Sequence, residues 1–154
     1  MSNFDMKIGE YFLHILIEET MSLYSQSEGS INPKVTVRGL GRSMDTQPKK
    51  DIQYSTNCFW GDHFYFSRNF TGRDELEAET VVVSVFDHSK ILKDSLVGSV
   101  EMNLSSIYFM PKHAIHNKWF ILQNKAKDHQ QIYGYIKLSM NLSSISDERV
   151  GCVA

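Results

Sequence analysis

ETVVVSVFDHSKILKDSLVG, residues 79–98, decides the fold class. The stretch opens on a β-branched run, residues 80–85, which leads into Phe86 and Asp87. β-Branched side chains favour extended strands. A short polar loop follows, and residues 96–98 begin a second apolar run. The stretch therefore predicts two strands joined by an exposed loop, with the carboxylate of Asp87 at the root of that loop.

Further strands are predicted on both sides of this stretch from the alternation of apolar and polar residues. Residues 34–40 place Val35 and Val37 on one face, as a half-buried strand does. Residues 11–18 read as a strand, although their dense apolar run also allows a helix. The remaining predicted strands are residues 51–56, 64–70, 80–86, 96–104, 118–123 and 132–142.

Helix contributes little to the predicted fold. Residues 73–79 are the only helix-like stretch, residues 41–50 read as a polar connection, and residues 105–117 read as irregular. About eight strands with long loops, and no regular alternation with helices, predict an all-β, eight-stranded antiparallel sandwich.

The length and composition are those of a single domain with a core of its own. The chain has 154 residues, of which 42% are hydrophobic and 12% aromatic. We predict one domain over residues 10–143, with flexible ends at residues 1–9 and 144–154. The aromatic side chains expected to face the core are Tyr54, Phe59, Trp60, Phe64, Phe66 and Trp119.

Charge and targeting signals limit the partners. The formal net charge of −2 gives no global basic excess for nucleic acid. No apolar run reaches the roughly 20 residues of a membrane span. Cys58 and Cys152 lie far apart and no secretory signal precedes them, so the expected compartment is the cytoplasm, with reduced thiols. Any contact with a membrane is then expected to be peripheral.

Catalytic motifs are missing from the sequence. It holds no HExxH metal motif, Gly-rich phosphate loop, nucleophile elbow or CxxC pair. His113 and His116 have helical spacing, but Pro111 argues against a helix there. Cys58 is a candidate reactive thiol without an obvious activating neighbour in the sequence. The chain is therefore predicted not to be an enzyme.

Three motifs, in order along the chain, resemble those of C2 domains. Residues 32–35 (NPKV) open the strand after the first long loop. Residues 56–66 (TNCFWGDHFYF) are similar to a TNPxWxExFxF segment, with Cys58 in place of the proline. Residues 85–87 (VFD) and 96–98 (LVG) resemble a VxD…DxxIG pair.

The C-terminal part of the chain looks most like the second C2 domain of ferlins, which are large, tail-anchored proteins of vesicle fusion and membrane repair. The resemblance implies the permuted (type II) C2 topology, in which the extra strand is the last one and both chain ends lie opposite the metal loops. The fragments that carry it are Ile107-Tyr108, Pro111, His113-Ala114, Lys118-Trp119 and residues 134–139.

The resemblance also implies where calcium ligands would lie. Calcium takes 6–8 oxygen ligands, several of them carboxylates. Asp87 alone keeps a charge among the implied positions, so calcium binding is expected to be weak or absent; the alternative role of Asp87 is to accept hydrogen bonds from loop amides. Either Asp94 or Glu28, close to these positions, could contribute. The implied positions are Gln26, Asn32, Asp87, Ser89 and Ser95.

Two surfaces are candidates for lipid binding. One is the apolar loop tips, which either insert into the headgroup region or fold back over the sandwich end: Ile91 and Leu92, with Met21, Leu23, Tyr24 and Ile31. The other is a basic face of the kind that binds phosphoinositides in many C2 domains, or else a solvated polar face diluted by Asp45 and Asp51: Lys34, Arg38, Arg42, Lys49 and Lys50.

Two functions are consistent with these features. The first is a C2 module that docks on anionic phospholipid or phosphoinositide membranes largely without calcium, in vesicle traffic or fusion. The second is an interaction domain that contacts neighbouring C2 domains or other proteins and binds no lipid.

Overall fold

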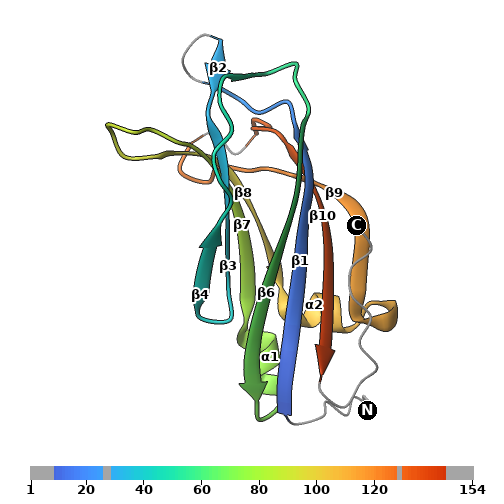
Figure 1. Ribbon diagram of the computed structural model, residues 1–154. Helices are drawn as coiled ribbons and strands as arrows, with labels where there is room; N and C mark the ends of the chain where they lie inside the picture. Colours follow the sequence, from blue (N-terminus) through green and yellow to red (C-terminus); the bar gives the residue numbers. More distant parts are fainter. Residues whose placement is uncertain (1–8, 26–28, 128–129, 145–154) are drawn as a thin grey trace.

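The structure, a computed structural model, describes residues 9–25, 29–127 and 130–144 as two facing β-sheets with short helices at one end (Figure 1). The strands are β1 (Gly9–Met21), β2 (Ser30–Ile31), β3 (Pro33–Gly39), β4 (Arg42–Asp45), β5 (Ile52–Gln53), β6 (Cys58–Phe70), β7 (Thr80–Asp87), β8 (Ser95–Asn103), β9 (Ala114–Ile121) and β10 (Tyr135–Ser144). The helices are α1 (Arg73–Ala78), α2 (Leu104–Tyr108) and the 3₁₀ turn η1 (Pro111–His113).

Each large sheet has four antiparallel strands, in the orders β6-β1-β10-β9 and β4-β3-β7-β8. The predicted all-β sandwich and its number of strands are therefore confirmed. The membership of the sheets differs at one strand. Of the predicted strand 51–56, only β5 is a strand, and it pairs with β2 outside the two large sheets. The predicted polar connection 41–50 instead contains β4, which belongs to the second sheet.

Residues 79–98 form β7, at the centre of the second sheet, and the beginning of β8. β7 lies between β3 and β8, with Val83 opposite Val37 and Val100. Because side chains alternate across a strand, every second residue of β7 points into the core. The fully buried valines are Val35, Val37, Val81, Val83 and Val85.

The strand order matches the permuted topology that the sequence predicts. β1 lies between β6 and the last strand, β10, and Tyr11 faces Ser144 across the ladder. The beginning of β1 and the end of β10 therefore lie together at one end of the sandwich. The β1–β2, β4–β5 and β7–β8 connections lie at the other, which we call the loop end (Figure 1).

Helices lie at the end opposite the loops. α1 falls within the predicted helical residues 73–79. The prediction that residues 105–117 are irregular was wrong, because α2 and η1 occupy much of this stretch. The side chain of Asn103 accepts a hydrogen bond from the backbone N–H of Ser105 and so caps α2.

The predicted core aromatics divide into two groups. Phe64 and Phe66 are buried as expected, but Phe59, Trp119 and Tyr54 are exposed, at 70%, 37% and 59%. β6 alternates without interruption from Cys58 to Phe66, so Cys58 shares the core face with Phe64 and Phe66 while Phe59 points outward. Trp60 is half-buried, and its indole N–H donates to the Thr20 hydroxyl.

Candidate functional site

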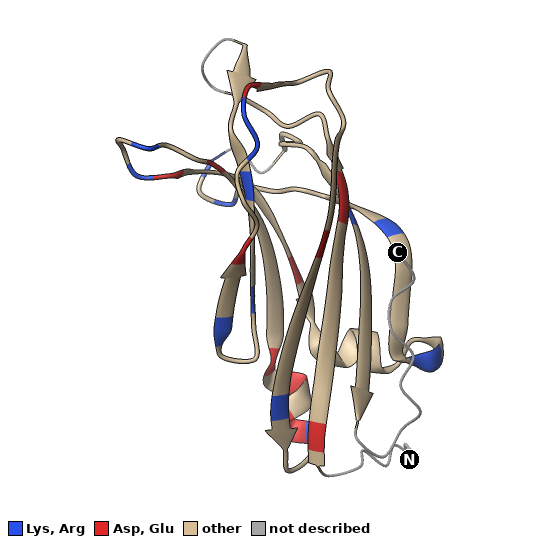
Figure 2. Cartoon of the chain, in the orientation of Figure 1, with Lys and Arg blue, Asp and Glu red and all other residues tan. Residues whose placement is uncertain are grey.

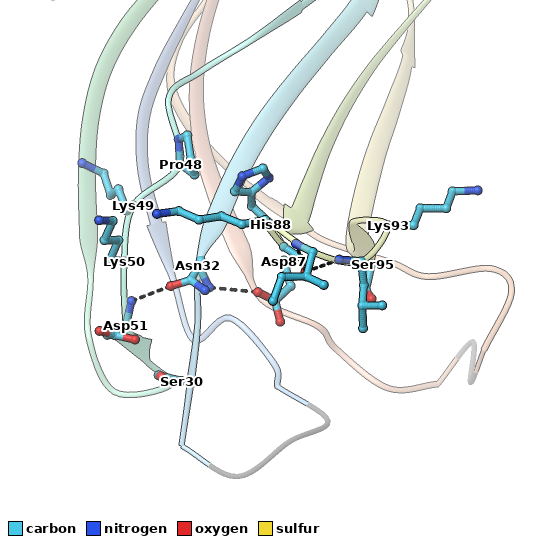
Figure 3. A pocket seen from close by; sticks show the side chains of 14 residues that line it. Ser30, Asn32, Pro48, Lys49, Lys50, Asp51, Asp87, His88, Lys93 and Ser95 are labelled. Carbon is cyan, nitrogen blue, oxygen red and sulfur yellow. Dashed lines mark hydrogen bonds between the residues drawn. The ribbon is translucent and has the colours of Figure 1, made fainter.

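A pocket of about 640 Å³ opens at the loop end of the sandwich, between the residues that follow β4 and the third loop, residues 88–94 (Figure 3). Its lining joins the predicted calcium positions to the predicted apolar tip and to lysines from both sides. The lining residues are Ser30, Asn32, Pro48, Lys49, Lys50, Asp51, Asp87, His88, Ser89, Lys90, Ile91, Leu92, Lys93 and Ser95.

Asn32 ties the walls of this pocket together. Its backbone N–H donates to Asp87 Oδ1 at 2.9 Å, and its carbonyl accepts from the His88 N–H at 2.8 Å. Its side-chain oxygen accepts from the Asp51 N–H at 2.9 Å. Asn32 and Asp87 therefore already serve as hydrogen-bond acceptors within the protein, and both fix the positions of the loops.

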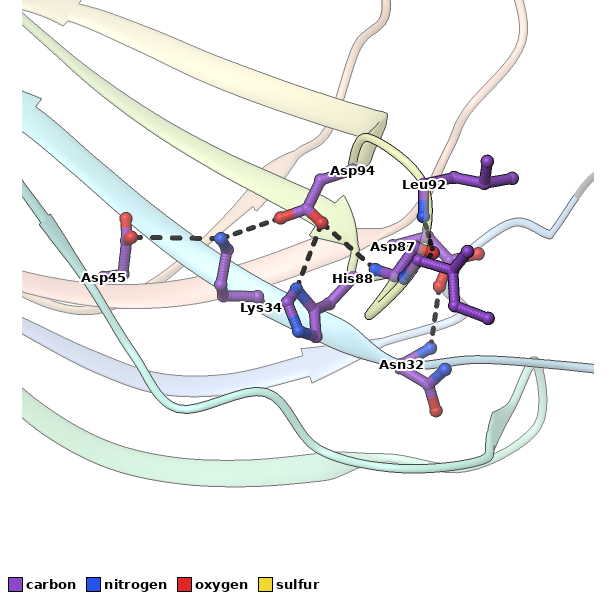
Figure 4. Close-up of polar contacts among 9 residues, drawn as sticks. Asn32, Lys34, Asp45, Asp87, His88, Leu92 and Asp94 are labelled. Carbon is purple, nitrogen blue, oxygen red and sulfur yellow. Dashed lines mark hydrogen bonds and ion pairs between the residues drawn. The ribbon is translucent and has the colours of Figure 1, made fainter.

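Asp94 is neutralised by a lysine from the neighbouring strand (Figure 4). Lys34 Nζ lies 2.7 Å from Asp94 Oδ2 and 3.9 Å from Asp45 Oδ2. The other oxygen of Asp94 accepts from the Ser89 N–H and contacts the His88 ring. The Lys34 ammonium, helped by the Ser89 N–H, lowers the pKa of Asp94 to about 2, and Asp94 in turn raises the pKa of Lys34.

Ser89 shapes the tip of the third loop. Its hydroxyl oxygen accepts hydrogen bonds from the backbone N–H groups of Ile91 and Leu92, at 3.2 and 2.8 Å. The turn leaves the side chain of Ile91 93% exposed and that of Leu92 77% exposed. These are the two most exposed large hydrophobic side chains of the described chain.

The apolar residues of the first loop behave differently from those of the third. Leu23 and Ile31 are each 2% exposed and belong to the core cluster. Tyr24 packs partly against that cluster, edge-on to Tyr133. Of the two roles considered for the apolar tips, the described apolar residues of the first loop therefore cover the sandwich end, with Met21 half-buried. Among the candidate tip residues that the structure describes, only Ile91 and Leu92 are largely exposed.

The described oxygen atoms fit calcium poorly. Asp87 is the one implied position with a charge, and it already accepts the Asn32 N–H. Asp94 is directed toward Lys34 and the root of its own loop. Within residues 9–25, 29–127 and 130–144, no three His, Cys, Asp or Glu side chains gather into a metal-binding group. Gln26 and Glu28 lie outside the described residues.

Lysines dominate the charge of the pocket. Lys49, Lys50, Lys90 and Lys93 line it together with two aspartates. None of these four makes an ion pair within the described parts of the chain, in contrast to Lys34. Lys90 and Lys93 were not singled out from the sequence, although they flank Ile91-Leu92 and give the tip the amphipathic pattern of an interfacial segment.

The other predicted lipid-binding residues lie apart from the pocket. Arg38 and Arg42 are exposed and lie on the neighbouring strands β3 and β4. Basic positions on these strands are coloured blue in Figure 2. Lys34 shares the outer face of β3 with Arg38, but its charge is balanced by Asp94 and Asp45. The structure thus separates the five predicted basic residues into a loop-end pair, Lys49 and Lys50, and a strand group.

Cys58 does not have the environment of a reactive thiol. It is 3% exposed, and burial raises the pKa of its thiol. Lys49 lies near enough to oppose this effect only in part, and its Nζ lies over the Trp60 ring, 4.8 Å from the centroid.

No described helix is long and apolar enough to cross a bilayer.

Comparison with known proteins places this geometry in a family. The C2 domain family model matches residues 12–122. Myoferlin of Xenopus tropicalis is 29% identical over 119 residues, and human myoferlin is 28% identical over 122 residues. The matches cover 77% and 79% of this chain but 6% of each relative.

Solved structures agree with this fold. A C2 domain of plant Extended Synaptotagmin 1 superposes with a TM-score of 0.67 at 17% identity, covering 93% of this chain and all of that one. The predicted resemblance to C2 domains and to ferlins is confirmed, while the position of the second ferlin C2 domain stays a prediction. The chain belongs to the C2 domain family.

Proposed function

We propose that this C2 domain is a non-enzymatic module that docks peripherally on anionic phospholipid membranes through its loop end, without requiring calcium. The observation that carries the proposal is the third loop, which exposes Ile91 and Leu92 beside four lysines that make no ion pair within the described chain. Apolar tips and cationic flanks are what an interface of acyl chains and anionic headgroups binds. The similarity to myoferlin, a ferlin, supports extending this proposal to a cytoplasmic role in vesicle traffic or fusion.

The independence from calcium is supported by the Lys34–Asp94 pair. Asp94 is the carboxylate next in sequence to Ser95, one of the implied calcium positions. To bind it, calcium would have to compete with the Lys34 ammonium, 2.7 Å away. In the same region Ser89 and Ser95 stand where carboxylates would be needed. The loop end therefore keeps its shape through internal hydrogen bonds rather than through a metal.

The test is vesicle binding of the Ile91→Ser/Leu92→Ser variant. Full burial of one such side chain contributes about 1.5–3 kcal/mol, so we expect at least a roughly 10-fold loss of affinity for phosphatidylserine vesicles. The matched control is Phe109→Ser/Met110→Ser at the α2 end, where the side chains are 56% and 40% exposed. Equal effects of the two variants would contradict docking through the third loop.

A second candidate is a protein-interaction domain. It is favoured by the outer face of the first sheet, where Phe59, Glu19, Lys137 and Trp119 lie opposite one another on four adjacent strands. Phe59 and Trp119 are exposed there. Neighbouring C2 domains or other proteins are the partners this surface would take. It becomes the main function if the domain binds no vesicles.

A further inference from the structure

We propose that the loop-end pocket is itself a headgroup site, and that it selects lipids whose headgroup ends in a phosphate monoester over lipids with only a phosphate diester. This inference rests on the proposed docking to membranes and adds the class of ligand. The monoester would occupy the space between the β4–β5 connection and the third loop, where the resemblance to C2 domains implies calcium.

The charge of the lining matches such a ligand. The lining contains four lysines and two aspartates, Asp51 and Asp87, so its formal charge is +4 − 2 = +2 with His88 neutral. A phosphate monoester carries about −1.5 to −2 at pH 7 and offers three acceptor oxygens. A diester carries a single negative charge, and leaves part of the lysine charge uncompensated.

The hydrogen bonds of the pocket place its lysines on two opposing walls. The Lys49 N–H donates to the Pro33 carbonyl at 2.9 Å, which holds the β4–β5 connection against β3. Lys90 and Lys93 lie on the third loop, which Asn32 joins to the same connection through Asp51 and Asp87. A bound phosphate would therefore meet donors from both walls. The flexible lysine stems would let the ammonium groups turn onto it, that of Lys49 by leaving the Trp60 ring.

The alternative anion site, the outer face of β3 and β4, is less suited to this ligand. Lys34 Nζ already contacts Asp94 and Asp45. Arg38 and Arg42 remain exposed there, but no described pocket includes either of them together with an apolar tip. Among the described pockets, only the one at the loop end combines several lysines with Ile91 and Leu92, which would reach the acyl chains of the same lipid.

The experiment compares vesicles containing phosphatidic acid, a monoester, with vesicles containing phosphatidylglycerol, a diester, both in phosphatidylcholine and matched in surface potential. We expect at least about 10-fold tighter binding to phosphatidic acid. The Lys49→Gln/Lys50→Gln variant should lower this preference to near 1, whereas the charge-matched control Lys112→Gln/Lys118→Gln should keep it. Thermal melts establish that each variant is folded.

The other outcomes separate this inference from the proposed function. Equal binding of the wild-type domain to both vesicles would overturn the monoester site and leave membrane docking in place. Loss of the preference in Arg38→Gln/Arg42→Gln, with Lys49→Gln/Lys50→Gln unaffected, would move the site to β3 and β4 and also overturn it. No binding to either vesicle would refute the docking function itself.

Discussion

Replacing Asp94 by asparagine should destabilise the domain, because this carboxylate joins the third loop to the second sheet. The change keeps the shape of the side chain and removes its charge. The new amide oxygen could still accept the Ser89 N–H and contact the His88 ring, so the main loss is the contact with the Lys34 ammonium at 2.7 Å. The two side chains are 19% and 22% exposed, and so the pair is neither fully screened nor fully buried.

The magnitude follows from these limits. Exposed ion pairs contribute about 0.2–1 kcal/mol, and hydrogen bonds to charged groups about 1.5–3 kcal/mol. We therefore expect Asp94→Asn to lower the free energy of unfolding by about 1–2 kcal/mol in urea titrations at pH 7. Asp45→Asn is the control, because Asp45 lies 3.9 Å from the same ammonium and is half-exposed; its cost should be below about 0.5 kcal/mol.

The pH dependence gives an independent check. The pKa of Asp94 is about 2 in the folded domain, below its value of about 3.9 in an unfolded chain. A lowered carboxylate pKa stabilises the fold above the unfolded pKa, and that stabilisation disappears as the pH falls through the folded pKa. The difference between wild type and Asp94→Asn should be constant above about pH 5 and shrink from about pH 4 toward pH 2. A difference that grows on acidification, or equal costs for the two substitutions, would refute this reasoning.

Three further predictions concern calcium, the core and the loop end. Millimolar calcium should leave the melting temperature unchanged, since a ligand that binds the native state must raise it. A clear rise would show that the domain binds calcium. Val83→Ala, at a fully buried position, should cost about 2–3 kcal/mol in urea titrations, and a cost below about 1 kcal/mol would contradict the packing. Gly134→Ala should cost about 1–3 kcal/mol, because φ is +143° and the new Cβ would lie 2.9 Å from Leu23 Cδ2; an unchanged melting temperature would count against this conformation.

The fold was predictable because its strands alternate clearly and its central valines are β-branched. One error came from not following a regular alternation, and another from a predicted strand that ends early. Phe59 points outward because β6 alternates without interruption from Cys58 to Phe66, which places Phe59 on the face opposite to Phe64 and Phe66. The prediction that all three point inward did not follow this alternation. Residues 51–56 alternate like a strand, yet Asp51 has a φ of +53° and the pairing ends after two residues.

The resemblance implied positions for candidate site residues but not the contacts that those residues make. The resemblance to C2 domains located Asn32, Asp87 and Ser89 in the lining of one pocket. It did not indicate that Lys34 would neutralise Asp94, since these residues are far apart in the sequence and meet only through the pairing of β3 with β7. That contact separates Lys34 from the lysines at the loop end, and long-range contacts of this kind require the fold.

The central claim is calcium-independent docking of the loop end on anionic membranes. The most direct measurement is co-sedimentation of the domain with phosphatidylserine vesicles, in chelator and again with calcium, with phosphatidylcholine vesicles as the reference. We predict binding to the anionic vesicles in chelator, unchanged by calcium and weakened by salt, as expected for lysines at a charged interface. Binding that appears only with calcium, or no binding in either condition, would contradict the account.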